Sequence, residues 1–385
     1  MTFQKRIAAA AAAAAVASLA AGAAAAADIT LYGRIDTGLS ISEPSRSGEN
    51  GTVEMKSGIF AGSRWGLIAE EELAGGAKLR VKLENAFDSS TGVWNSTSTN
   101  RLFGRESSLS LITNWGTFAV GRIGMVTGGI GSFSSLDWYD PFETGFTDAS
   151  LPGTWADIGT VDKSVVYASP MFAGFNVKLQ FGFTDSTLDN SGKNIYDGRW
   201  NQNSHPWGAA FEYRGIPNLF VGWGVGGVKL GRASGNEGRS DPLLANFAVN
   251  YDFGFIKPFV AAQYSEHFTY ATGNSAGELC QMDGVTAFEH DGDFKKTAYL
   301  VGITAPMGGG LLRAAAQYVD GEEQTTGDDF SKQVYAVGYT YPFSKRTLFY
   351  SALSYSKGGG LLSKSNPTAT HENRTMLEIG IDHMF

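Results

Sequence analysis

Hydrophobic and polar residues alternate with a period of two in many short segments of the chain. In the first of these segments, Ile29 and Leu31 lie on one face of an extended chain, whereas Thr30 and Tyr32 lie on the other. Successive side chains of a β-strand point to opposite faces, so the pattern predicts strands with one apolar face and one polar or small face. Helical spacing is not sustained after residue 27. The clearest alternating segments are 29–37, 63–70, 78–87, 299–304, 312–318 and 377–385.

Short and long connections take turns between these segments. Seven short turns lie at 74–76, 114–116, 170–174, 215–218, 252–254, 306–310 and 342–345. Eight longer polar stretches lie at 41–57, 89–100, 125–160, 186–205, 231–241, 268–294, 320–331 and 358–372. Short turns on one rim and long loops on the other are typical of a transmembrane β-barrel. The fifteen connections therefore predict an all-β fold, a 16-stranded antiparallel transmembrane barrel over 28–385.

A secreted soluble protein with several β-sandwich domains is the alternative architecture. Such a protein has no need to confine its long loops to alternate connections. It also buries its large apolar side chains against a second sheet, whereas a barrel turns them toward lipid. The regular alternation of connection lengths favours the barrel.

The first 27 residues predict an export signal. Lys5 and Arg6 form a basic start, an alanine-rich apolar run follows, and residues 25–27 are all alanine, which suits a cleavage site before Asp28. An uncleaved membrane anchor is the alternative, but alanine is only weakly apolar and no stop-transfer pattern follows. After Asp28 no apolar stretch approaches the ~18 residues that a spanning helix needs.

Composition removes several classes of protein. The chain has 50 glycines among 385 residues, and 18% of it is charged, below the usual share of about a quarter. With 12% aromatic residues, it resembles neither a coiled coil nor a charged disordered chain. The single cysteine, Cys280, excludes an internal disulfide and a thiolate metal cage. A net charge of −8 gives no reason to expect nucleic-acid binding.

Several segments resemble the general bacterial porins of the Gram-negative outer membrane. They are LYGRID at 31–36, SRWG at 63–66, and the segments NRLFGR at 100–105 and WGTFAVGR at 115–122, which are similar to the family's fourth and fifth strands. The chain also closes on a terminal phenylalanine, Phe385, preceded by alternate apolar residues. The resemblance covers nearly all of 28–385.

The resemblance implies a water-filled barrel, usually a homotrimer, that passes small hydrophilic solutes and ions by passive diffusion. It implies a location in the Gram-negative outer membrane, among lipid and lipopolysaccharide, and no enzyme activity, cofactor or metal. The last strand with Phe385 resembles the signal that the barrel-assembly machinery reads. The third long loop, here 125–160, is expected to fold inward and narrow the pore.

The predicted third loop is acidic and aromatic. It contains no Lys or Arg, and its aromatic residues Trp138, Tyr139, Phe142, Phe146 and Trp155 argue against disorder because they need a surface to pack on. We expect Asp137, Asp140, Glu143 and Asp148 to form the acidic side of a pore constriction, and Asp157 belongs to the same acidic set.

Basic residues on the polar faces of the first strands are expected to face this loop. Strand parity places Arg34, Arg64, Arg80 and Lys82 toward the lumen. Opposite charges across a narrow gap create a transverse field that sorts solutes by charge and dipole. Alternatively, the acids only solvate an extracellular loop and the bases pair with acids on their own strands. Parity assigns Arg105 and Arg122 less clearly, so a subunit contact or a loop latch stays open for both.

Net charge suggests a weak cation preference, because loss of Lys5 and Arg6 takes the formal charge from −8 to −10. A substrate-specific channel for sugars or organic acids on the same barrel is the first alternative function. An outer-membrane lipase or protease and a secreted β-adhesin are more distant ones. The segment 222–227 matches G-x-G-x-x-G, but strand residues follow it, so we interpret it as a glycine-rich strand. The five histidines share no metal-ligand spacing.

Overall fold

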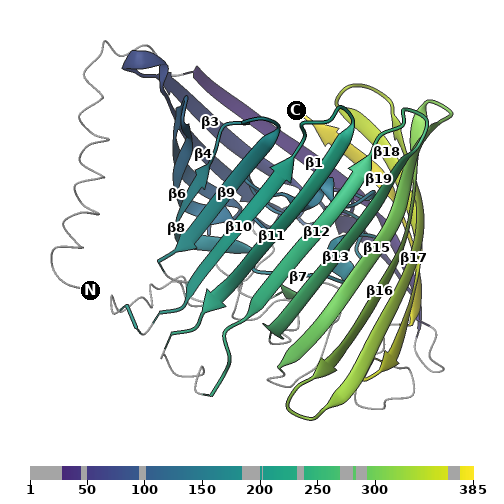
Figure 1. The fold of residues 1–385 in the computed structure, drawn as a ribbon. Helices are drawn as coiled ribbons and strands as arrows, with labels where there is room; N and C mark the ends of the chain where they lie inside the picture. Colours follow the sequence, from purple (N-terminus) through teal and green to yellow (C-terminus); the bar gives the residue numbers. More distant parts are fainter. Residues whose placement is uncertain are drawn as a thin grey trace.

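Antiparallel pairing joins each strand to its neighbours in the chain and closes the sheet on itself (Figure 1). The computed structural model describes residues 28–44, 50–94, 101–183, 200–201, 203–231, 238–268, 281–282, 293–362 and 373–385. The strands are Asp28–Pro44 (β1), Thr52–Ser57 (β2), Arg64–Glu72 (β3), Lys78–Ala86 (β4), Glu106–Thr113 (β5), Gly116–Gly124 (β6), Thr160–Ala168 (β8), Phe175–Gly182 (β9), His205–Tyr213 (β10), Leu219–Lys229 (β11), Leu243–Tyr251 (β12), Lys257–Phe268 (β13), Phe294–Met307 (β15), Gly310–Glu323 (β16), Asp328–Pro342 (β17), Thr347–Gly360 (β18) and Arg374–Met384 (β19). Two short strands, Ala156–Asp157 (β7) and Gln281–Met282 (β14), pair apart from this sheet.

The barrel closes between its first and last strands. β1 pairs with β19 in a continuous antiparallel register from Arg34 with Met384 to Pro44 with Arg374. β2 pairs with the second half of β1 and β3 with the first half, so β2 and β3 together form the second barrel strand. The described residues thus form a closed barrel of sixteen strands, which confirms the predicted fold class.

The connections follow the predicted alternation with two exceptions. All seven predicted short turns join consecutive strands, at the upper rim in Figure 1. The predicted loop at 41–57 is wrong in its bounds, because β1 continues to Pro44 and β2 begins at Thr52. The predicted loop at 320–331 is also wrong: β16 and β17 pair as far as Glu323 with Asp328, and only 324–327 turn. Their polar residues lie on strands, which polarity alone does not distinguish from a loop.

The fourth barrel strand starts later than its motif. Residues 101–105 precede β5, which begins at Glu106. Arg101 is buried, and its guanidinium pairs with both carboxylate oxygens of Asp162 at 2.7 and 2.8 Å. This bidentate pair ties the start of the segment to β8, on which Asp162 lies.

Apolar side chains cover the outside of the barrel and polar side chains fill its inside. On β1, Ile29 and Leu31 are 67% and 65% exposed, whereas Asp36 is fully buried. On β16, Arg313 and Gln317 are 4% and 3% exposed. This reversal of the usual soluble pattern is what a lipid-facing barrel requires.

The apolar core lies inside the barrel, between its wall and residues 125–159. This segment connects β6 to β8 and contains two short 3-10 turns, Leu136–Trp138 and Leu151–Gly153. Four of its aromatic side chains pack into the main cluster and are at most 1% exposed: Tyr139, Phe142, Phe146 and Trp155.

The predicted signal peptide at 1–27 and Cys280 lie outside the described residues. Within the residues that the structure describes, no helix is long and apolar enough to cross a membrane.

Two opposed glycines permit a tyrosine to lie against the closing seam. Gly38 of β1 faces Gly380 of β19, and the buried Tyr350 side chain covers both. The Tyr350 hydroxyl donates a 2.5 Å hydrogen bond to Asp36, whose second oxygen accepts the backbone N–H of Phe60 at 2.7 Å. A Cβ on Gly38 would lie 2.4 Å from the Ile379 carbonyl oxygen and 2.8 Å from the tyrosine hydroxyl. The seam therefore requires glycine at this position.

We expect Gly38→Val to lower the temperature at which the barrel unfolds. The added side chain collides with backbone, and overpacking of this kind costs about 1–3 kcal/mol. The shift of the folded band on unheated and heated denaturing gels measures the unfolding temperature. Leu39→Val, at an outward residue that is 42% exposed, is the matched control and should unfold at the wild-type temperature. Equal temperatures for both variants would contradict this account of the seam.

Candidate functional site

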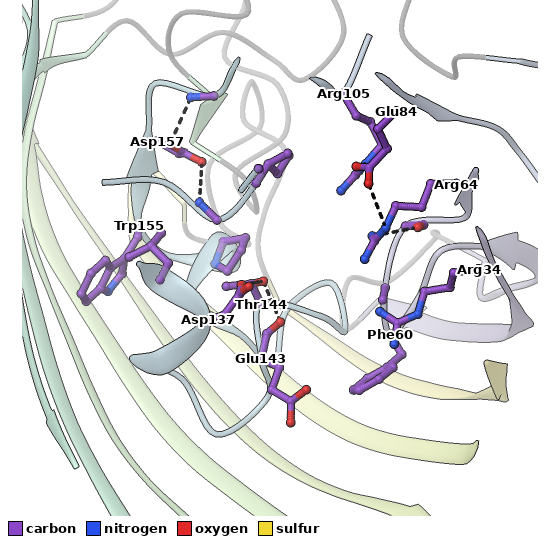
Figure 2. A pocket seen from close by; sticks show the side chains of 18 of the residues that line it. Arg34, Phe60, Arg64, Glu84, Arg105, Asp137, Glu143, Thr144, Trp155 and Asp157 are labelled. Carbon is purple, nitrogen blue, oxygen red and sulfur yellow. Dashed lines mark hydrogen bonds and ion pairs between the residues drawn. The ribbon is translucent and has the colours of Figure 1, made fainter. Parts of the chain in front are cut away.

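A cavity of about 390 Å³ lies between the wall formed by β1, β3 and β4 and the inward segment 125–159. Figure 2 shows arginines and Glu84 on one side of it and the acids of the segment on the other. Eight charged side chains line the cavity: Arg34, Arg64, Lys82, Glu84, Arg105, Asp137, Glu143 and Asp157.

Glu84 is the centre of the basic wall. Arg105 donates to its carboxylate at 2.7 Å, and Arg64 and Lys82 lie 3.8 and 3.7 Å from it. The Glu84 side chain is only 6% exposed, whereas Arg64 and Arg105 are 24% and 19% exposed. The carboxylate therefore lies behind the cations, and the surface that meets the lumen is positive.

Arg34 repeats this layered arrangement. Its guanidinium pairs at 2.9 Å with Asp382, which is fully buried, while the Arg34 side chain keeps 18% exposure. Lys82 adds a second buried partner, because its ammonium also pairs with Glu106 at 3.0 Å. In each pair the cation is the member nearer to solvent.

Asp137 and Glu143 form the acidic side of the cavity. The Thr144 hydroxyl donates to Asp137 at 2.9 Å, and Arg313 on the far wall donates to Glu143 at 2.7 Å. Asp157 accepts the backbone N–H of Gly159 at 3.0 Å. Burial raises the pKa of Asp137 and of Asp157 above the ordinary aspartate range, because the confined site disfavours their charged forms. Their negative charge is therefore reduced at mildly acidic pH.

Asp140 and Asp148 are buried away from the cavity: Asp140 holds the backbone of the segment itself, and Asp148 ties the segment to the barrel through Lys332 and Arg374. Asp140 is 1% exposed and accepts the backbone N–H groups of Phe142 and Leu151 at 2.7 and 2.5 Å; burial raises its pKa to about 7. Burial would also raise the pKa of Asp148, but Lys332 and Arg374 outweigh it and hold that pKa below its usual range.

The predicted site residues therefore divide into two groups. The structure brings Arg34, Arg64, Lys82, Asp137 and Glu143 together around the cavity. The other three predicted residues lie away from the cavity lining: Asp140 binds the backbone within the segment, Asp148 anchors the segment to β19, and Arg80 pairs with Glu70 at 2.5 Å.

Arg105 belongs to the cavity but was not assigned to it from the sequence. Strand parity fails for this residue because β5 begins one residue later. Arg122 pairs with Asp162 at 2.8 Å and donates to the Gly104 carbonyl at 2.6 Å, so it latches the segment that carries Arg105. The NRLFGR motif, with one arginine at each end of a short apolar stretch, was the available signal.

On the opposite wall, inward-facing glycines leave space for aromatic side chains of the segment. A Cβ on Gly222 would lie 2.5 Å from the Tyr139 ring, and one on Gly338 would lie 2.8 Å from Phe142. Residues 222–227 lie within β11, as predicted, and their glycines make room for this contact.

Inward polar side chains bind the backbone of the segment. Gln263 accepts the Ala156 N–H at 2.5 Å and donates to the carbonyl of the same residue at 2.9 Å. Lys296 donates to the Thr154 carbonyl at 2.6 Å. These bonds satisfy backbone groups that would otherwise be buried without partners, so the segment has one defined position. Among the described residues, no cluster of three or more metal-ligating side chains occurs.

Comparison with known proteins gives consistent matches across the chain. The family model described as Gram-negative porin matches residues 9–361. An outer membrane porin protein of Bordetella pertussis is 30% identical over 381 residues, 93% of this chain and 94% of the relative. Outer membrane porin protein 32 of Delftia acidovorans is 28% identical over the same shares.

Solved structures share the fold at lower identity. The anion-selective porin from Comamonas acidovorans has a TM-score of 0.65 and 22% identity, and the match covers 93% of this chain and all of that one. OmpT of Vibrio cholerae, in a form described as a trimer, has a TM-score of 0.57 and 19% identity over 94% of this chain and all of that one.

We expect Asp148→Asn to loosen the inward segment. The change removes the charge of Asp148 from its buried ion pair with Lys332, which is 1% exposed, and breaking a buried pair costs about 3–5 kcal/mol. Chymotrypsin cleavage within 125–159 of the folded, detergent-solubilised barrel measures the loosening and should become faster. Asp328→Asn, at an exposed residue, should leave cleavage at the wild-type rate. A resistant Asp148→Asn variant would show that this ion pair does not anchor the segment.

Proposed function

The chain belongs to the Gram-negative porin family and is an outer-membrane channel, and from the geometry of its lumen we propose that it passes small hydrophilic solutes and ions by passive diffusion. The observation that carries the proposal is the cavity with cations on one side and acids on the other. Segment 125–159 would act as the constriction loop, and solutes would be sorted by size and charge without a covalent step or a cofactor.

The sorting mechanism follows from where the charges lie. Arg34, Arg64 and Arg105 stand on the wall, and Asp137 and Glu143 stand on the loop across the cavity (Figure 2). A transverse field of this kind aligns water and dipolar solutes, and an apolar solute has to displace that ordered water. Hydrophilic solutes therefore pass more easily than apolar solutes of the same size.

The weak cation preference that we expected from net charge is not supported by the geometry. Two of the four predicted constriction acids, Asp140 and Asp148, are 1% exposed and do not line the cavity. Glu84 lies behind its cations, and Glu143 is neutralised in part by Arg313. We therefore propose a modest anion preference, set by the solvent-facing cations of the wall.

Assembly of the channel is a further part of the proposal. A homotrimer is proposed, and the Vibrio cholerae OmpT structure described as a trimer supports it. Phe385 pairs through its backbone N–H and carbonyl with Gly33, at 3.0 Å each, where the barrel closes. This position suits a residue read by the barrel-assembly machinery, and contact with outer-membrane lipid and lipopolysaccharide stays a prediction.

Reversal potentials in planar bilayers under a KCl gradient test the ion preference. We expect the wild type to favour chloride, and Arg64→Gln with Arg105→Gln to reduce this preference about twofold per charge removed, the effect of one charge at about 10 Å in water. Arg80→Gln is the control, because Arg80 pairs with Glu70 away from the cavity lining. Clear cation preference in the wild type would contradict the assignment, and absence of conductance from folded barrels would contradict the channel function.

The anion preference should fall as pH rises from about 4 to 7. Burial raises the pKa of Asp137, so this carboxyl is neutral at the acidic end and gains negative charge above its ordinary titration range. Reversal potentials recorded across this interval measure the change, and Asp137→Asn should reduce it. Asp252→Asn, at a short turn, serves as the control. An equally steep pH dependence in Asp137→Asn would exclude Asp137 as its source.

A further inference from the structure

One aromatic side chain of the constriction loop is left open to the lumen. Trp138 is 45% exposed, whereas its neighbours Tyr139 and Trp155 are 1% exposed. Leu136 and Asp137 line the cavity, and Trp138 lies just beyond them, against the wall at the short-turn end of β10 to β12. The exposed part of the indole is not stabilised by packing against other apolar side chains. We therefore ask which ligand the exposed ring could bind.

One contact holds the backbone of Trp138, and two hold its indole ring. Asn250 donates to the Trp138 carbonyl at 2.7 Å. The Arg214 guanidinium carbon lies 4.0 Å from the centroid of the indole ring, and the Phe220 ring stacks 6.0 Å from it at 29°. The ring is therefore presented in one fixed orientation, and a ligand that stacks on it does not have to immobilise it first.

Two cations accompany the indole at the same end of the barrel. Arg214 follows β10, pairs with Glu212 at 3.2 Å and stays 29% exposed. Lys257 begins β13 on the face that points inward, and its ammonium lies 5.0 Å from the Phe259 ring centroid. Within the described part of the chain Lys257 forms no ion pair within 4 Å, although it interacts electrostatically with Asp252, Glu143 and Arg214. β10 to β13 are consecutive neighbours in the wall (Figure 1).

Resting on the proposed channel function, we propose that Trp138, Arg214 and Lys257 form a binding site for small aromatic carboxylates. The ligand ring would stack on the open part of the indole, and its carboxylate would accept hydrogen bonds from the Lys257 ammonium and the Arg214 guanidinium. An aliphatic anion would leave the indole uncovered, and a neutral sugar would leave the Lys257 ammonium without a hydrogen-bonded anion. The channel would then carry such anions with saturable kinetics, beside its unspecific diffusion.

Block of single-channel current by benzoate tests the site. Acetate supplies the charge without a ring, cyclohexanecarboxylate supplies a ring without aromaticity, and glucose is the neutral sugar. We expect benzoate, added on the short-turn side, to interrupt the current in a saturable way. Its half-blocking concentration should be about tenfold below that of cyclohexanecarboxylate, in proportion to the gain from aromatic stacking.

Variants then separate the parts of the site. Trp138→Leu should raise the half-blocking concentration of benzoate about tenfold, and Trp138→Phe should restore most of the block. Lys257→Gln should weaken block by benzoate. Trp115→Leu is the matched control, because Trp115 is 79% exposed at the turn between β5 and β6. Each block is expressed relative to the open current of the same variant.

The outcomes distinguish this site from the channel function. Channels that conduct KCl but are blocked by benzoate no more strongly than by acetate, or more strongly by glucose, would overturn the site and leave the channel function intact. If folded barrels do not conduct, calorimetric titration of benzoate into the detergent-solubilised protein still tests whether the binding site exists. Saturable heat that Trp138→Leu removes supports the site, and its absence from the wild type overturns it.

Discussion

Polar side chains on the inner face of this barrel take their hydrogen-bond and ion-pair partners from within the lumen, because the outer face is apolar and turned toward lipid. Segment 125–159 supplies many of those partners. Gln263 and Lys296 bind its backbone, and Lys332 and Arg374 bind the buried Asp148. In return, the wall receives the aromatic side chains of the segment over inward glycines such as Gly222. These hydrogen bonds, ion pairs and aromatic contacts between the wall and the segment set the position of the segment. The position of the segment in turn sets the width of the lumen and the placement of the cavity charges.

The same layering explains why total charge is a poor guide to the behaviour of this channel. Asp382 and Glu84 are counted in the formal charge, yet each lies behind an arginine that meets the solvent. Asp148 is counted as well, although it lies in a buried ion-pair cluster. A passing ion responds to the charges nearest to it, because the interaction falls with distance and is screened by salt. Local placement therefore decides the expected preference.

Local periodicity predicted most of the fold, whereas the site depended on contacts between distant segments. Alternation placed Arg34 and Arg64 on the inner face, because strand parity is a local property. It did not place Arg105, which precedes β5 in a segment that Arg101 ties to the distant Asp162. Nor did it separate Asp137 from Asp148, since the partners of Asp148 lie about two hundred residues further along the chain.

Chemical modification of one loop residue tests most directly whether the acidic loop faces the conducting path. In a Cys280→Ser background, Asp137→Cys carries a single thiol at the cavity. We predict that methanethiosulfonate reagents reduce the single-channel current in discrete steps, and that a cationic reagent shifts the reversal potential toward anions while an anionic reagent shifts it toward cations. Complete modification, verified by mass, with neither current nor reversal potential altered would contradict the account.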